Sequence, residues 1–141
     1  MKIRKLLFLL LSCGLFLILA ALGGCGTVSS AEDAEKVAAR FYEAAKAGDY
    51  ATVAGMFINA DSGARAVDQL KLNQNKLGNL QSYKLRDATV NTVFSGRRFT
   101  LKYVTKYPEY GATEWLIMFE NVSEPGIKIE VYKVDSKGLQ H

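Results

Sequence analysis

Apolar residues between positions 30 and 77 recur every three or four residues, which is the spacing of one face of an α-helix. Ser29 and Glu32 have the spacing of a capping box at the start of this pattern, and Gly48 offers a left-handed stop after its first stretch. The sequence therefore predicts a first helix that begins near Ser30 and ends at Gly48. Its apolar stripe consists of Ala34, Val37, Ala38, Phe41 and Ala45.

Two further helices are predicted before the periodicity changes. Asp49 is a favourable N-cap residue for a second helix, and apolar side chains follow it at helical spacing up to Phe57. After a loop at residues 59–63, a third helix is expected to end at Leu77. Its apolar face is thinner, so we expect this helix to pack at the rim of the domain. That face consists of Val67, Leu70 and Leu77.

From residue 80 onward the pattern becomes alternating, which is typical of half-buried β-strands. Hairpin signals and turns separate four such segments, and the third, at residues 115–119, is apolar on both faces, which predicts a central strand. Helices followed by strands indicate an α+β fold, with N-terminal helices packed on a curved antiparallel four-stranded meander sheet. The positions expected to face the core are Tyr83, Leu85, Phe99, Leu101, Tyr103, Ile127, Ile129 and Val131.

The first 24 residues have the pattern of a signal peptide. Three of the first five residues are basic, and residues 6–22 are almost wholly apolar. Gly23 and Gly24 then precede Cys25, and small residues at this point suit a signal peptidase. An uncleaved membrane anchor is the alternative, but the apolar run is short for a stable span. We expect cleavage between Gly24 and Cys25.

The segment Leu22-Gly23-Gly24-Cys25 resembles the bacterial lipobox, in which the cysteine thiol receives a diacylglycerol and becomes the first residue of the mature chain. A rival site at Cys13 would leave only residues 6–11 as the apolar run of the signal. The resemblance at Cys25 implies an exported lipoprotein, held by acyl chains such as palmitate in the cell membrane or outer membrane. Its folded part would lie on the non-cytoplasmic side, within the cell envelope.

These limits divide the chain into four parts: a signal peptide at 1–24, the lipidated cysteine and a short tether at 25–31, an α+β domain at 32–136, and a polar tail at 137–141. A tether of five or so residues reaches at most roughly 17 Å, which keeps the domain near the bilayer. Of 18 basic and 14 acidic residues, three basic ones leave with the signal, so 15 remain against 14. This net charge of +1, without a clustered basic face, gives no reason to expect a nucleic-acid partner.

The stretch from Ala34 to Phe57, with Phe41-Tyr42 and the break Gly48-Asp49-Tyr50, resembles the opening of the cystatin-like, nuclear-transport-factor-two-like superfamily. Residues 78–83 and 124–132 are similar to bacterial members. The resemblance implies a curved sheet wrapped around the first helix, forming a cone with an apolar cavity at one end. The superfamily includes enzymes, ligand carriers and dimerising adaptors, so it does not fix a function.

Side chains for catalysis are scarce in this chain. His141 is the single histidine and the last residue, and no cysteine remains once Cys25 is lipidated. A nucleophile–base pair, a metal cluster or a cofactor site is therefore not expected. Glu114 and Glu120 flank the central strand about 20 Å apart, too far to act on one bond. We expect each to be an exposed charge at a strand end, and the protein not to be an enzyme.

The aromatic residues leave two hypotheses open. Tyr42, Tyr103 and Trp115 are candidates for the lining of an apolar cavity, although aromatic residues in sheets more often pack in a core. The first hypothesis is non-catalytic binding of a small apolar ligand or a protein segment. The second is a dimerising assembly module of the cell envelope. Both require an apolar sheet face, so the sequence does not separate them.

Overall fold

The computed structural model describes residues 28–140, so the predicted signal peptide, the lipidation at Cys25 and His141 lie outside the described residues. The described chain is an α+β fold of three helices followed by an open antiparallel meander sheet. The elements are α2 (Ala31–Ala47), α3 (Tyr50–Gly55), α4 (Ala60–Leu77), β1 (Ser82–Val93), β2 (Gly96–Lys106), β3 (Gly111–Asn121), β4 (Glu124–Asp135) and a 3-10 turn, η1 (Lys137–Leu139).

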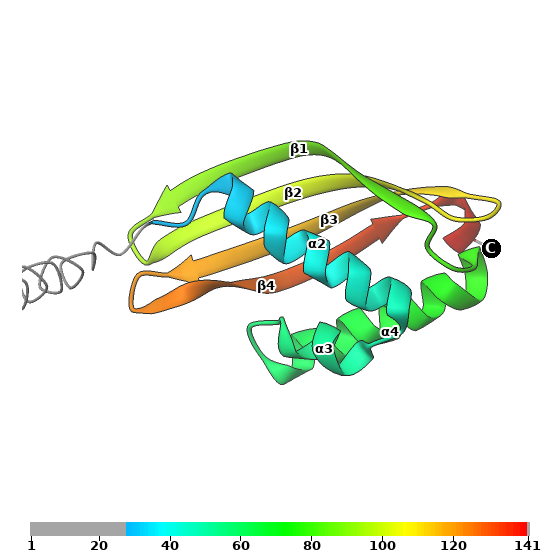
Figure 1. Cartoon of the computed structure of the whole chain (residues 1–141), viewed down its shortest axis with the longest axis horizontal. Helices are drawn as coiled ribbons and strands as arrows, with labels where there is room; N and C mark the ends of the chain where they lie inside the picture. Colours follow the sequence, from blue (N-terminus) through cyan, green and yellow to red (C-terminus); the bar gives the residue numbers. More distant parts are fainter. Residues whose placement is uncertain (1–27, 141) are drawn as a thin grey trace, which may run out of the picture.

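Figure 1 shows α2 lying across one face of the sheet, with α3 and α4 beside the β4 edge. The strand order is β1-β2-β3-β4, so β3 is a central strand as predicted. The chain that follows α3 is attached to β4, because Ile58 N–H donates to the Ile129 carbonyl at 2.9 Å and Ile129 N–H donates to the Met56 carbonyl at 3.0 Å. The three helices thus lie on one side of the sheet, and the opposite face carries none of the described helices.

The capping box of α2 lies one residue later than the sequence predicted. Ser30, not Ser29, is the N-cap, and its side chain accepts from Asp33 N–H while Asp33 accepts from Ser30 N–H at 2.9 Å. Asp33 therefore takes the place expected for Glu32. The predicted stop at Gly48 is confirmed, because this residue ends α2 with a left-handed φ of 70°. The predicted N-cap of α3 at Asp49 is also confirmed.

The third helix lies at the edge of the sheet, as expected, but its contact with α3 is close. A Cβ at Gly63 would lie 2.6 Å from the Ala54 carbonyl oxygen, so the absence of a side chain lets α4 approach α3 closely. Val67, expected on the apolar face, is only partly buried, and Asn73 is buried instead. The buried face of α4 consists of Ser62, Gly63, Ala66, Leu70, Asn73 and Leu77.

The core lies between α2 and the covered face of the sheet. Phe41 is at its centre, with its ring centroid 5.2 Å from that of Tyr42 and 5.0 Å from that of Tyr132. Every second side chain of β2 and β3 points into this core and forms its sheet side. The sequence predicted this alternation for β2. The fully buried large apolar side chains are Phe41, Tyr42, Val53, Phe99, Leu101, Leu116, Met118 and Ile129.

A β-bulge in β4 overturns the expected alternation of that strand. Ile129 pairs with Met118 and Val131 pairs with Ile117, so Glu130 is an extra residue between them. Val131 was expected to face the core with Ile129, but it lies on the opposite face and is 37% exposed. The same bulge turns Tyr132 toward the core.

The C-terminal segment, expected to be a polar tail, is partly structured. Residues 137–139 form η1. Ser136 precedes this turn as its N-cap, and the Ser136 hydroxyl donates to the Gly111 carbonyl at 2.9 Å. Gly138 is buried so closely against Leu77 and Tyr110 that a Cβ would overlap both side chains. The turn therefore closes the end of the sheet where β2 meets β3.

Candidate functional site

Glu114 is a buried carboxylate at the start of β3, with no exposed surface. The expectation of an exposed charge at a strand end is therefore wrong. Three hydroxyl groups hold the carboxylate: Thr105 Oγ1 and the Tyr107 hydroxyl donate to Oε1 at 2.8 and 2.7 Å, and the Tyr132 hydroxyl donates to Oε2 at 2.9 Å. Two of these donors come from the end of β2 and one from β4, so the carboxylate joins three neighbouring strands.

Burial dominates the electrostatics of this cluster. Loss of water raises the pKa of Glu114 above its ordinary value of 4.5, and the hydrogen bonds from Tyr107, Thr105 and Tyr132 only partly offset this effect. Burial and the nearby carboxylate together raise the pKa values of Tyr107 and Tyr132. The phenols therefore stay protonated and act as hydrogen-bond donors.

The hydroxyl cluster extends from the sheet to α4. Asn73 Nδ2 donates to the Tyr132 hydroxyl at 3.0 Å, and Gln69 Nε2 donates to Asn73 Oδ1 at 2.8 Å. Tyr42 is the exception, since its buried hydroxyl has no hydrogen-bond partner among residues 28–140. A polar network in a core fixes one arrangement of the elements that it joins, because unpaired polar groups there are costly. We interpret the network as the connection that positions α4 on the sheet.

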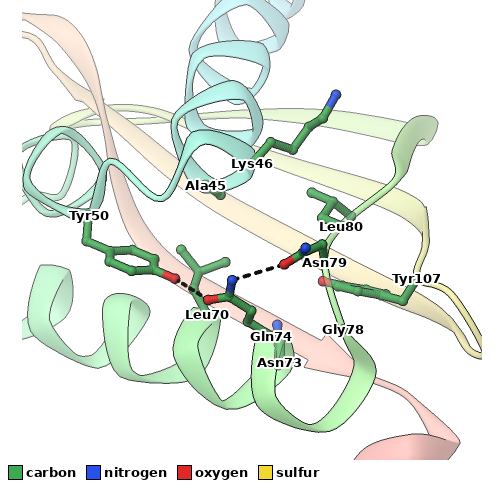
Figure 2. Close-up of a pocket in the computed structure, with 10 residues that line it drawn as sticks. All are labelled: Ala45, Lys46, Tyr50, Leu70, Asn73, Gln74, Gly78, Asn79, Leu80 and Tyr107. Carbon is green, nitrogen blue, oxygen red and sulfur yellow. Dashed lines mark hydrogen bonds between the residues drawn. The ribbon is translucent and has the colours of Figure 1, made fainter.

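A small cavity adjoins this network between the ends of α2 and α4 (Figure 2). The Tyr50 hydroxyl donates to Gln74 Oε1 at 2.9 Å, and Gln74 Nε2 donates to Asn79 Oδ1 at 3.0 Å across its mouth. Asn73 and Tyr107 belong to both the cavity wall and the Glu114 network, but Glu114 itself does not line the cavity. The volume is about 40 Å³, which holds water but is far below the roughly 300 Å³ of a small-molecule site.

The structure brings together two of the three residues expected to line an apolar cavity. The rings of Tyr42 and Tyr103 lie 4.9 Å apart, and Tyr83 stacks on Tyr42 at 4.5 Å, so the three rings pack against one another. Burial raises the pKa of Tyr103 to about 12. Trp115 lies on the opposite face of the sheet, because it pairs with Lys102 and Lys133 and not with the core positions.

The face of the sheet opposite α2, which we call the uncovered face, carries a row of large apolar side chains along β3. This row consists of Trp115, Ile117 and Phe119, all partly exposed. The register places Lys102 and Lys133 on either side of Trp115. It likewise places Arg98 and Lys128 on either side of Phe119. Each aromatic residue is therefore flanked by a cation on both neighbouring strands.

The flanking cations contact the rings directly. Lys102 Nζ lies 5.8 Å from the Trp115 ring centroid, and Arg98 Cζ lies 5.8 Å from that of Phe119, within cation–π distance. Arg98 also pairs with Glu130 at 3.2 Å. Within the part of the chain that the structure describes, Lys102, Lys128 and Lys133 have no carboxylate partner at salt-bridge distance. The uncovered face thus presents an apolar row beside three lysines without such a partner and one arginine, Arg98, that is paired with Glu130.

Two larger depressions of about 540 and 520 Å³ lie at opposite ends of the sheet. Both are shallow, open to solvent and lined by charged residues such as Asp135 and Lys137 at one end, and Asp33 and Arg40 at the other. Neither encloses an apolar ligand. The uncovered face, by contrast, combines a row of apolar side chains with flanking cations.

Comparison with protein-family models, curated proteins and solved structures finds no match to this chain. Residues 28–140 contain no group of three or more histidine, cysteine, aspartate or glutamate side chains placed to hold a metal ion. Over the same residues, no helix has the length and apolar character needed to cross a membrane.

Proposed function

We propose that this chain is an exported lipoprotein, anchored through Cys25, whose cystatin-like domain binds an acidic protein segment without catalysing a reaction. One observation carries the binding proposal: the row of Trp115, Ile117 and Phe119 lies on the uncovered face beside three lysines, Lys102, Lys128 and Lys133, that have no carboxylate at salt-bridge distance among residues 28–140. The anchor rests on the lipobox-like sequence at Cys25. The domain would then work in the cell envelope, on the non-cytoplasmic side of a cell membrane or outer membrane.

A protein segment fits this surface better than a small apolar ligand. The cavity between the ends of α2 and α4, of about 40 Å³, is too small for such a ligand. The apolar row from Trp115 to Phe119 extends about 14 Å along β3, which matches roughly five residues of an extended chain. Apolar side chains of the segment would contact the row, and its carboxylates would face the flanking lysines.

A second copy of this domain is a poorer occupant of the same face. A two-fold contact through the uncovered face would bring Lys102, Lys128 and Lys133 of both copies together. Like charges facing each other across an interface are unfavourable, whereas an acidic partner complements them. The dimerising module therefore remains the alternative, and measuring oligomeric state distinguishes it from the proposal.

The anchor is tested by changing its cysteine. Cys25→Ala is expected to yield a chain that lacks the mass of the acyl chains and no longer floats with membranes in a density gradient. Two or more acyl chains are needed for stable attachment, so removing the lipidation site abolishes it. Cys13→Ala is the matched control and should float like the natural chain. Flotation of Cys25→Ala to the same extent would contradict the proposed anchor.

The binding surface is tested through Trp115, which is the single tryptophan of the chain and lies on the uncovered face. Purified full-length protein is titrated with a synthetic peptide of alternating glutamate and valine, and separately with a peptide of alternating lysine and valine. We expect a saturable change in tryptophan emission with the acidic peptide only. An unchanged emission, or equal responses to both peptides, would contradict the proposal. A stable dimer in sedimentation would favour the assembly module.

A further inference from the structure

Two hairpin tips lie side by side at one end of the sheet and expose apolar side chains there. The turn between β1 and β2 is joined to the turn between β3 and β4, because Val122 N–H donates to the Ser95 carbonyl at 3.0 Å. Phe94 at the first tip is fully exposed, and Val122 at the second is 71% exposed. Phe94 therefore contributes nothing to the core, and with Val122 it forms an exposed apolar patch at this end of the sheet.

The chain enters the domain at this same end. The Ser29 side chain donates to Glu120, and Arg97 Nη1 donates to the Ser29 carbonyl at 3.0 Å. Glu120 and Arg97 belong to the strand ends directly beside the two tips. Ser29 is therefore held next to the tips by two contacts, and Val28 before it is also largely exposed.

The distance from the anchor to the tips is limited by the length of the chain. Ser29 lies four positions after Cys25, and an extended chain spans at most roughly 14 Å over four residue steps. A lipid on Cys25 therefore keeps the end of the domain that carries Phe94 and Val122 within a short distance of the bilayer surface. This step rests on the anchor proposed above.

We propose that the two tips form a membrane-docking surface, in which Phe94 and Val122 enter the interfacial layer of the bilayer. Aromatic residues are favoured at the membrane–water interface, and apolar side chains gain free energy when they leave water. The charges near the tips are balanced, since Arg97 lies opposite Glu120, Arg98 pairs with Glu130, and Lys128 and Glu124 both lie at the start of β4. Insertion of apolar side chains, not charge attraction, therefore drives the docking, and it persists at high salt.

Docking at the tips sets the orientation of the domain. The strands lead away from the tips for 11 or 12 residues, or about 37 Å, toward the turn at residues 107–110. Figure 1 shows this turn and the C-terminus at the end of the sheet opposite the two tips. The uncovered face then stands away from the bilayer plane and stays open to a partner.

The test places a tryptophan at the tip of the full-length lipidated protein. Phe94→Trp is made with Trp115→Phe, and the protein is incorporated in vesicles of phosphatidylethanolamine and phosphatidylglycerol with brominated acyl chains. Bromine quenches tryptophan only on close approach. We expect the tryptophan at position 94 to emit at shorter wavelength and to lose most of its intensity, both in low and in high salt.

Tyr110→Trp in the same Trp115→Phe background is the matched control, because Tyr110 is a partly exposed aromatic residue at the far turn. Its emission is expected to be unaffected by brominated lipid. Protein that floats with the vesicles but shows equal emission at positions 94 and 110 overturns the docking and leaves the anchor intact. Protein that does not float overturns the anchor, and the docking proposal fails with it.

Discussion

The Lys102 ammonium group lies 5.8 Å from the centroid of the Trp115 ring, and Lys133 flanks the same ring from β4. These two lysines place positive charge on both sides of Trp115 on the uncovered face. Replacing both, Lys102→Glu with Lys133→Glu, should reverse the preference of the face from acidic to basic peptides, because the sign of the flanking charge is reversed. Tryptophan fluorescence titrations with the two alternating peptides measure this preference.

Lys71→Glu is the matched control for that reversal. Lys71 also lies over an aromatic ring, 5.4 Å from the centroid of Tyr50, but on the helical side of the domain. Its replacement should leave the peptide preference unchanged. A reversal in the Lys71 variant, or none in the Lys102 and Lys133 variant, would show that the binding is not located on the uncovered face.

Glu114 should make the domain less stable as pH rises. Its pKa is raised by burial, so the folded protein binds this proton more tightly than the unfolded chain. The stability contributed by the protonated form is complete below the unfolded pKa near 4.5 and is lost as pH rises toward the folded pKa, with a slope of at most about 1.4 kcal/mol per pH unit.

Glu114→Gln removes this titration while keeping the shape of the side chain. The difference in unfolding free energy between the natural protein and this variant should therefore fall with increasing pH above about 4.5, as measured by denaturant unfolding at several pH values. Taking the difference cancels the pH dependence contributed by other carboxylates, which both proteins share. Asp33 is one of these: hydrogen bonds from Ser30 lower its pKa to about 2, so its contribution to stability rises with pH. A difference that is constant or rises with pH would contradict the assignment.

Gly63 should not tolerate a methyl group, although alanine is normally the better helix former. A Cβ there would meet the Ala54 carbonyl oxygen at 2.6 Å and would force α3 and α4 apart. We expect Gly63→Ala to lower the unfolding free energy by about 1–3 kcal/mol, as overpacking does. Gly55→Ala is the control, because no atom lies within 4 Å of its Cβ position, and it should be neutral or stabilising.

Phe41 and Phe94 should differ sharply in what they contribute to folding. Phe41 is fully buried against Tyr42, Phe57 and Tyr132, so Phe41→Ala should cost about 3–5 kcal/mol in thermal or denaturant unfolding. Phe94 is fully exposed, so Phe94→Ala should change the stability of the domain by less than about 0.5 kcal/mol. A large loss of stability in the second variant would mean that Phe94 packs within the domain.

Local patterns predicted most of the elements because each depends on residues close in sequence. The stripe of Ala34, Val37, Ala38 and Phe41 is buried in α2, and Gly48 ends that helix where its backbone must become left-handed. Alternation placed Phe99, Leu101 and Tyr103 in the core. The capping box was misplaced by one residue because Ser29-Ser30 and Glu32-Asp33 offer two equivalent spacings, and only tertiary contacts choose between them.

Two features of the site depend on contacts distant in sequence. Glu114 lies on the same face of β3 as Leu116 and Met118, and this spacing is the one feature of the sequence that indicates its burial. A buried carboxylate also requires hydroxyl donors, and these come from the neighbouring strands. The bulge at Glu130 carries no pattern of its own, yet it turns Tyr132 inward and Val131 outward. Periodicity assumes an unbroken strand, so it could predict neither the carboxylate network nor the full extent of the uncovered face.

We propose that an acidic segment of another protein binds the uncovered face, and photo-cross-linking in the producing cells detects such a partner. A benzoylphenylalanine is placed at Val131 on that face, or at Leu72 on α4 as a control of similar exposure, and the cross-linked peptide is sequenced. We predict that Val131, but not Leu72, gives an adduct to an acidic segment of another envelope protein. No adduct at Val131, the same adduct at both positions, or an adduct to a second copy of this chain would contradict binding of an acidic segment at this face.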